Sequence, residues 1–121
     1  MADLNELIEQ YLATWNDKDP ASRRTRLEEV WASDGSYVDP LVAANGIDEI
    51  DATIAAVQAQ FPDLAFRLAG TVDSHHHMAR FTWELAADGG EALVVGFDVA
   101  VLTQDGRLGQ VHGFLDKVPA A

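Results

Sequence analysis

Apolar residues in the first half of the chain recur at steps of three and four, which is the spacing of one face of an α-helix. The spacing predicts one helix over residues 4–15 and another over 47–61, the second ended by Pro62. Tyr11 falls on the apolar stripe of the first helix. We therefore expect its side chain to be buried.

A further helix between these two is predicted from its first residues. Asp19 suits the N-cap position, and Pro20 suits the first turn, where a missing backbone N–H costs no hydrogen bond. We expect this helix to run to about Ala32. Three of its basic side chains are expected to face solvent: Arg23, Arg24 and Arg26.

The second half of the chain changes to alternation with a period of two, which is typical of strands. Turns rich in Asp and Gly separate the alternating runs, as in β-hairpins. The predicted strands cover about residues 37–40, 64–72, 77–86, 93–102 and 107–117. Residues 33–36 are expected to form a turn, 41–45 a loop or short strand, and 118–121 a loose tail. Three helices followed by four long antiparallel strands predict an α+β fold in which a curved sheet wraps around the helices.

Asp98 is the only charged residue in the most apolar of these strands, residues 93–102. Side chains alternate across a strand, so Asp98 shares a face with Val94 and Ala100. Burial of an unpaired carboxylate is costly, and such a group is usually protonated, paired or used in chemistry. We therefore predict that Asp98 faces a pocket. The structural alternative is an ion pair with one of three basic residues: His77, Arg80 or His112.

The opposite face of the same strand carries large apolar side chains and no charge. These side chains are Val95, Phe97, Val99 and Val101. The short tail at the end of the chain is too small to cover them, so we expect the sheets of two copies to pack together as a homodimer.

Composition narrows the classes of function. A length of 121 residues fits one domain, and the absence of cysteine excludes disulfides and thiolate chemistry. A formal net charge of -12 disfavours nucleic acid and anionic membranes as partners. Because the chain has neither a signal-peptide pattern nor an apolar stretch long enough to span a bilayer, we expect a cytoplasmic protein. The expected ligand is an apolar small molecule, with no cofactor.

Several motifs along the chain resemble the nuclear transport factor 2-like superfamily, in its SnoaL-like and ketosteroid isomerase-like branch. They are YLATWNDKD at residues 11–19, WASDGSYVDP at 31–40, Gly46-Ile47, FPDL at 61–64, GFD at 96–98 and QDGRL at 104–108. The resemblance implies one domain over residues 1–121 with a cone-like fold, a cystatin-like roll of three N-terminal helices packed in a curved antiparallel sheet. The superfamily contains isomerases, cyclases and non-catalytic binding domains, so it implies a fold more firmly than an activity.

The resemblance also implies roles for three residues. Ketosteroid isomerases have a tyrosine on the first helix, an aspartate before a proline and a second aspartate in a late strand, which match Tyr11, Asp39 and Asp98. By this match Asp39 is the base, while Tyr11 and a protonated Asp98 donate hydrogen bonds to the enolate oxygen of an apolar carbonyl substrate. SnoaL-like polyketide cyclases need a single acid/base aspartate, for which Asp98 is the candidate. The limonene epoxide hydrolase type is set aside, because residues 80–82 lack its Arg and Asp pair.

Two of these residues also have a structural interpretation. Asp39 precedes a proline and could cap a local turn. Tyr11 could bury its ring in the core while its hydroxyl binds a carbonyl oxygen. The alternative to an isomerase-like or cyclase-like enzyme is therefore a non-catalytic ligand-binding or dimerisation domain.

Aromatic residues are expected to form the wall of the pocket, because ligand sites are mostly apolar. The candidates are Trp15, Trp31, Tyr37, Phe61, Phe81 and Trp83, with His112 either in the pocket or in the core. His75, His76 and His77 are consecutive, and neighbouring side chains on a strand point to opposite faces. They cannot all bind one ion, so we expect no metal site and a turn with one inward histidine.

Overall fold

The computed structural model describes residues 4–119, so the last two residues of the predicted tail and the first three of the chain lie outside it. The elements follow in the order α1 (Leu4–Asn16), α2 (Pro20–Val30), β1 (Trp31–Val38), β2 (Ala43–Asn45), α3 (Gly46–Gln60), β3 (Ala65–His75), β4 (Met78–Ala86), β5 (Ala92–Leu102) and β6 (Leu108–Lys117). The order is the predicted one. Among these residues no helix is long and apolar enough to cross a membrane.

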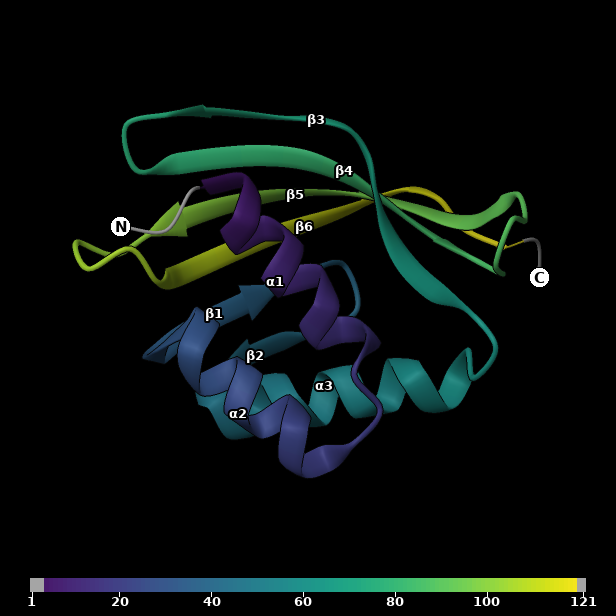
Figure 1. The fold of residues 1–121 in the computed structure, drawn as a ribbon, viewed down its shortest axis with the longest axis horizontal. Coiled ribbons are helices and arrows are strands. Elements are labelled where there is room, and N and C mark those ends of the chain that lie inside the picture. Colours follow the sequence, from purple (N-terminus) through teal and green to yellow (C-terminus); the bar gives the residue numbers. More distant parts are fainter. Residues whose placement is uncertain (1–3, 120–121) are drawn as a thin grey trace.

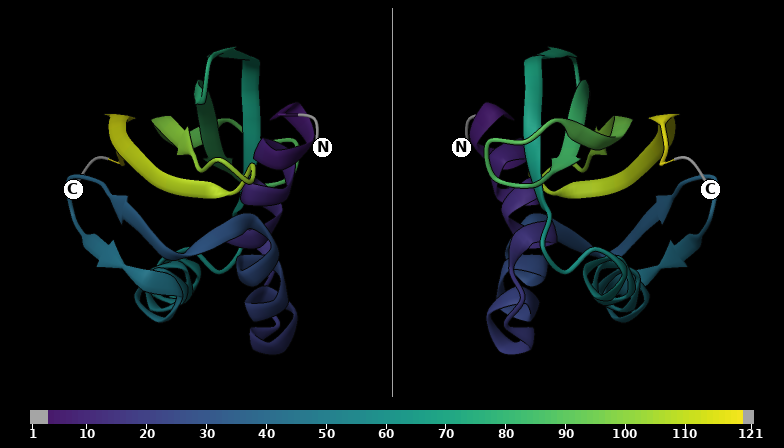
Figure 2. Two further views of the ribbon diagram at one scale, coloured as in Figure 1. Left: turned by 90° about the vertical axis from the view of Figure 1, so that its left-hand side faces the viewer. Right: turned by 90° about the vertical axis from the view of Figure 1, so that its right-hand side faces the viewer.

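The strands form one sheet in the order β2-β1-β6-β5-β4-β3. Figure 1 shows α1 lying across the sheet, while α2 and α3 lie beside β1 and β2. Seen from either end, the sheet curves around the helices (Figure 2). The α+β fold with three helices and a curved sheet is therefore confirmed. The sheet is antiparallel except where β1 pairs in parallel with β6, a pairing that the long connection between these two strands permits.

The boundary between α2 and β1 differs from the prediction. Trp31 has extended backbone angles (φ -101, ψ 146) and ends α2 at Val30, before the predicted end at Ala32. The predicted turn over residues 33–36 is part of β1, whose pairing with β6 shifts register between Trp31 and Ser36. A Cβ on Gly35 would lie 2.5 Å from the Trp31 ring, so glycine permits this packing. Strand pairing overrides the turn-like composition here.

The start of α2 is as predicted, but one of its arginines is buried where the sequence predicted exposure. The Asp19 side chain accepts a hydrogen bond from the backbone N–H of Ser22, 3.1 Å away, and caps the helix. Arg23, expected in solvent, is buried and its Nε lies 2.5 Å from Asp51 Oδ1 of α3. Its guanidinium also donates to the Gln58 side chain at 3.0 Å. The buried ion pair joins α2 to α3.

Strand β5 has the two faces predicted for it. Val94, Asp98 and Ala100 are buried beneath the helices, whereas the four apolar residues of the other face are half-buried. Gly96 lies under the Trp83 indole, and a Cβ there would lie 2.0 Å from the ring. The glycine thus lets Trp83 lie flat against β5. The buried face of the sheet packs on the apolar stripe of α1, which includes Tyr11.

Candidate active site

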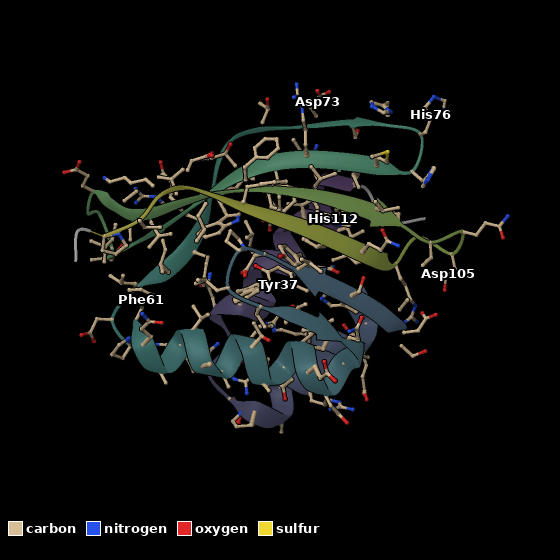
Figure 3. All side chains as sticks on the ribbon, turned by 180° about the vertical axis from the view of Figure 1, so that it is seen from behind. Tyr37, Phe61, Asp73, His76, Asp105 and His112 are labelled. Carbon is tan, nitrogen blue, oxygen red and sulfur yellow. The ribbon has the colours of Figure 1, made fainter. Side chains whose placement is uncertain are left out.

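A cavity of about 530 Å³ lies between α1, the sheet and the end of α3. Of the residues predicted for a pocket, those that line it are Tyr11, Trp15, Tyr37, Asp39, Phe61, Trp83 and Asp98. Figure 3 shows Tyr37 on β1 and Phe61 at the C-terminal end of α3. Trp15 packs against Tyr37 and Phe66 with ring centroids 5.5 and 5.2 Å apart. The volume is that of a site for a drug-sized molecule.

Three residues expected in the pocket do not line it. Phe81 packs edge-on against Tyr11, with ring centroids 5.8 Å apart, and belongs to the core. Trp31, the first residue of β1, is also buried and packs against Tyr11 with ring centroids 6.2 Å apart. His112 is neither in the pocket nor in the core. It is exposed on the outer face of β6, where its Nε2 lies 3.1 Å from the Gln110 side chain.

Asp98 lines this cavity and is 1% exposed. Its Oδ2 accepts a hydrogen bond from the Tyr11 hydroxyl at 2.9 Å. Its Oδ1 is buried and has no hydrogen-bond partner among the described residues. None of the expected basic partners reaches it, since Arg80 pairs with Asp73 at 3.0 Å and His77 is exposed. One oxygen of this buried carboxyl therefore has no hydrogen bond among the described residues, and the residue that carries it lines the cavity.

Burial raises the pKa of Asp98 to about 6, from 3.8. The nearby Trp83 indole and the Tyr11 hydroxyl oppose the rise, and the negative charge of Asp39 adds to it. Burial and the charge of Asp98 raise the pKa values of Tyr11 and Tyr37 above their usual 10. Both tyrosines are therefore protonated donors wherever Asp98 titrates.

Asp39 lies in different surroundings at the end of β1. Its Oδ2 accepts a hydrogen bond from the Tyr37 hydroxyl at 2.7 Å. Its Oδ1 accepts from the backbone N–H groups of Leu41 and Val42 at 2.8 and 3.0 Å. Both oxygens thus have donors, as in the turn-capping interpretation.

Gly113 of β6 brings the two carboxyl groups together. A Cβ at this position would lie 3.0 Å from Asp98 Oδ1, 3.2 Å from Asp39 Cβ and 3.4 Å from the Tyr37 hydroxyl. Any side chain here would crowd the free oxygen of Asp98. The glycine therefore keeps open the space between Asp98, Asp39 and Tyr37.

The rest of the cavity wall is apolar except for Gln60. Among the described residues that line it, there is no Lys, Arg or His. The residues that the sequence interpretation missed are Leu12, Leu41, Val57, Gln60, Phe66, Leu85, Val94, Leu115, Val118 and Pro119. Phe66 and Val94 could have been found, because each alternates with residues already placed on the inner face. The wall favours a neutral apolar ligand over an anionic one.

The histidine segment lies far from this cavity. His75 ends β3 and His76 adopts a positive φ of 51° at the tip of the β3–β4 hairpin, as Figure 3 shows. The expected turn is present, but all three histidines are exposed and none faces inward. Over residues 4–119, no three His, Cys, Asp or Glu side chains gather as a metal-binding group.

Comparison with known proteins shows which family and which fold this chain shares. The family model of the SnoaL-like domain matches residues 8–110 of this chain. A proposed isomerase of the SnoaL-like family from Agrobacterium tumefaciens is 40% identical, with a TM-score of 0.87, and the match covers 92% of this chain and 95% of that one. A proposed SnoaL-like polyketide cyclase from Jannaschia is 20% identical, with a TM-score of 0.70 and coverage of 93% and 86%.

A protein with a cystatin-like fold from Silicibacter pomeroyi is 15% identical, with a TM-score of 0.68 and coverage of 93% and 74%. No curated protein matches the chain significantly. The family match spans most of the chain, and the structural matches agree on its fold. The chain therefore belongs to the SnoaL-like family of the nuclear transport factor 2-like superfamily.

Proposed function

We propose that this protein is an enzyme that moves a proton next to the carbonyl group of a neutral, apolar substrate. The observation that carries the proposal is the free Oδ1 of Asp98, in a carboxyl group that is 1% exposed and adjoins an apolar cavity of about 530 Å³. A carboxylate with a pKa of about 6 is a stronger base than an ordinary aspartate and is still largely ionised at neutral pH.

In this mechanism the ionised Asp98 takes a proton from the carbon beside the carbonyl. The C–H electron pair becomes that of an enolate, and the Tyr37 hydroxyl, which donates to Asp39 in this structure, turns to donate to the enolate oxygen. Tyr11 holds Asp98 in place through Oδ2. The protonated Asp98 then returns the proton, either to another carbon in an isomerisation or to the alkoxide oxygen formed by ring closure in a cyclisation.

This chemistry can take two forms, which differ in whether Asp39 takes part in proton transfer. In the cyclase form Asp98 is the only acid/base group, which agrees with the three donors that already hold Asp39. In the isomerase form Asp39 is the base and a protonated Asp98 is a donor. Two observations favour retaining this second form: Asp39 lines the same cavity, and a 40% identical relative carries the name of a proposed isomerase.

Turnover of a β,γ-unsaturated ketosteroid, followed by the absorbance of the conjugated enone, tests the isomerase form directly. The pH dependence of any turnover then separates the two roles of Asp98. A rate that rises through pH 6 identifies Asp98 as the base, and a rate that falls through pH 6 identifies it as the protonated donor. If neither ketosteroids nor linear polyketide-like ketones react, whereas such ketones bind with or without Asp98, the non-catalytic binding domain is the better interpretation.

We also propose a homodimer through the outer face of the sheet. The support is the half-buried row Val95, Phe97, Val99 and Val101. On the neighbouring strand Phe114 pairs with Phe97 and is 56% exposed. Burial of such a row against a second copy would remove it from water. Light scattering coupled to gel filtration should give a dimer for the wild type and a monomer for Phe97→Asp; a monomeric wild type would contradict the proposal.

A further inference from the structure

Gly113 lies between the two aspartates of the site, in a row that crosses three strands. On one side it pairs directly with Asp98 of β5. On the other side, β1 runs parallel to β6 and pairs Val38 with His112. The next residues along these two strands, Asp39 and Gly113, therefore lie level with each other. A side chain at position 113 would stand between the two carboxyl groups.

The backbone does not explain why a glycine occupies this position. Gly113 does not have a positive φ, so any residue could adopt its conformation. Glycine weakens the interior of a strand, because it loses more conformational freedom on folding than other residues and packs no side chain. The reason for glycine must therefore lie in the space around the missing side chain.

That space is lined by polar side chains of the site. A Cβ at Gly113 would lie 3.0 Å from Asp98 Oδ1, the buried oxygen without a hydrogen bond, and 3.4 Å from Tyr37 Oη. At Gly35 and Gly96, by contrast, the atom nearest to such a Cβ belongs to a tryptophan ring. Those two glycines allow a ring to pack, whereas Gly113 adjoins a carboxyl oxygen.

We propose that Gly113 is a positioning residue that controls how Asp98 gains and loses its proton. A larger residue would press an apolar carbon against Oδ1, and an apolar cover disfavours the charged form of a carboxylic acid. Glycine thus keeps the buried Asp98 able to ionise near neutral pH. This inference rests on the site of the proposed function, but it concerns the proton affinity of Asp98 and is measured without a substrate.

Three titratable groups interact with Asp98: Tyr11 of α1, Tyr37 of β1 and Asp39 just after β1. Neither β4 nor β6 adds another, because these strands place Phe81 and Gly113 opposite Asp98. A methyl group at position 113 adds no charge to this set. A change in the pKa of Asp98 on adding it therefore reports on the cover over Oδ1.

The test measures the pKa of Asp98 in Gly113→Ala by carbon-13 NMR of protein labelled at the aspartate carboxyl carbons. Comparison with Asp98→Asn identifies the signal. Gly109→Ala is the matched control, because Gly109 is also on β6, has no positive φ, and a Cβ there would lie 3.1 Å from Thr103 Cγ2. The pKa of Asp98 should rise by about one unit in Gly113→Ala and stay at the wild-type value in Gly109→Ala.

Urea unfolding of the same proteins at about pH 5 and about pH 8 gives a second measurement. A folded-state pKa that is raised further gives stability at low pH that is lost as the pH rises through it. Relative to the wild type, Gly113→Ala should therefore be less stable at the higher pH than at the lower one. Gly109→Ala should differ from the wild type by the same amount at both.

Three results would overturn the inference. They are a folded Gly113→Ala in which the pKa of Asp98 is unchanged or lowered, an equal rise in Gly109→Ala, and a Gly113→Ala that is unfolded at both pH values. In the last case strand packing alone would require the glycine. A rise confined to Gly113→Ala, in a protein that converts no ketone, would support the inference and count against the proposed catalysis alone.

Discussion

Asp98 and Asp39 are two carboxyl groups on one cavity whose surroundings are nearly opposite. Asp98 is buried, has one donor on Oδ2 and leaves Oδ1 free. Asp39 is half-buried and has three donors shared between its two oxygens. A carboxylate whose two oxygens both accept from fixed donors is held in place by its turn, whereas burial of a carboxylate with an unpaired oxygen raises its pKa, as for Asp98. The comparison supports the proposal that Asp98 transfers the proton and that Asp39 positions the turn after β1.

The largest expected effect is on turnover. Asp98→Asn should lower kcat by about 10²- to 10⁴-fold, because it removes the group that exchanges the proton. Asp39→Asn should lower kcat by less than about tenfold, since an amide oxygen can still accept the backbone hydrogen bonds of the turn. Steady-state kinetics on any ketone that the wild type converts measures both values.

Asp73→Asn is a suitable control, because Asp73 is an exposed aspartate paired with Arg80 on the other side of the sheet. If Asp39→Asn lowers kcat as much as Asp98→Asn does, Asp39 does more than position its turn. The isomerase form, with Asp39 as the base, is then favoured.

The second effect is on stability. The folded-state pKa of Asp98 is raised, so its contribution to stability is fully present below about pH 4 and is lost as the pH rises through about 6. A rise from 3.8 to about 6 corresponds to roughly 3 kcal/mol. Asp98→Asn should therefore be more stable than the wild type at pH 7.5 by up to about this amount, and the advantage should vanish near pH 4. Urea unfolding of both proteins at several pH values measures it.

A difference that is constant with pH would contradict this prediction, because it would mean that Asp98 does not change its proton affinity on folding. Together with the kinetic result, a stabilised but inactive variant would show that the cavity holds Asp98 for chemistry at the expense of stability.

A third effect concerns the turn that follows β1. Asp39→Ala removes the acceptor for Leu41 N and Val42 N as well as the partner of the Tyr37 hydroxyl. We expect a loss of about 1–2 kcal/mol in the free energy of unfolding, with a smaller loss for Asp39→Asn. Chemical denaturation at pH 7.5 checks both values. Equal stability of Asp39→Ala and the wild type would argue against the positioning role.

The smallest expected effect is a shift in the pH dependence of the reaction rate. In the wild type, the hydrogen bond from Tyr11 to Asp98 Oδ2 lowers the pKa of Asp98. Tyr11→Phe removes this bond, so the pKa of Asp98 should rise. The midpoint of the pH–rate profile should move upward by about one unit, the size expected for the loss of one hydrogen bond to a charged group. If the rate falls at every pH while the midpoint stays in place, Tyr11 acts on the substrate and not through Asp98.

Much of the fold follows from local patterns that need no knowledge of neighbouring elements. Steps of three and four residues predicted α1 and α3, and the Asp19 and Pro20 pair predicted the start of α2. The same local reading was wrong for residues 33–36, where pairing with β6 draws a turn-like sequence into a strand. It was also wrong for Arg23, because only α3, nearly thirty residues away, supplies the partner that allows its burial.

For the site, the sequence determined that a lone carboxylate lies on the inner face of β5, since alternation along one strand is enough to show it. Tertiary structure alone decided which side chains meet. Trp31 and Phe81 have the same chemistry as Trp15 and Phe61 but do not line the cavity, because depth in the core depends on where strands cross the helix. His112 faces outward, on the opposite side of the sheet from the cavity. Periodicity assigns a residue to a face, whereas contacts between distant elements decide which residues on that face surround a cavity.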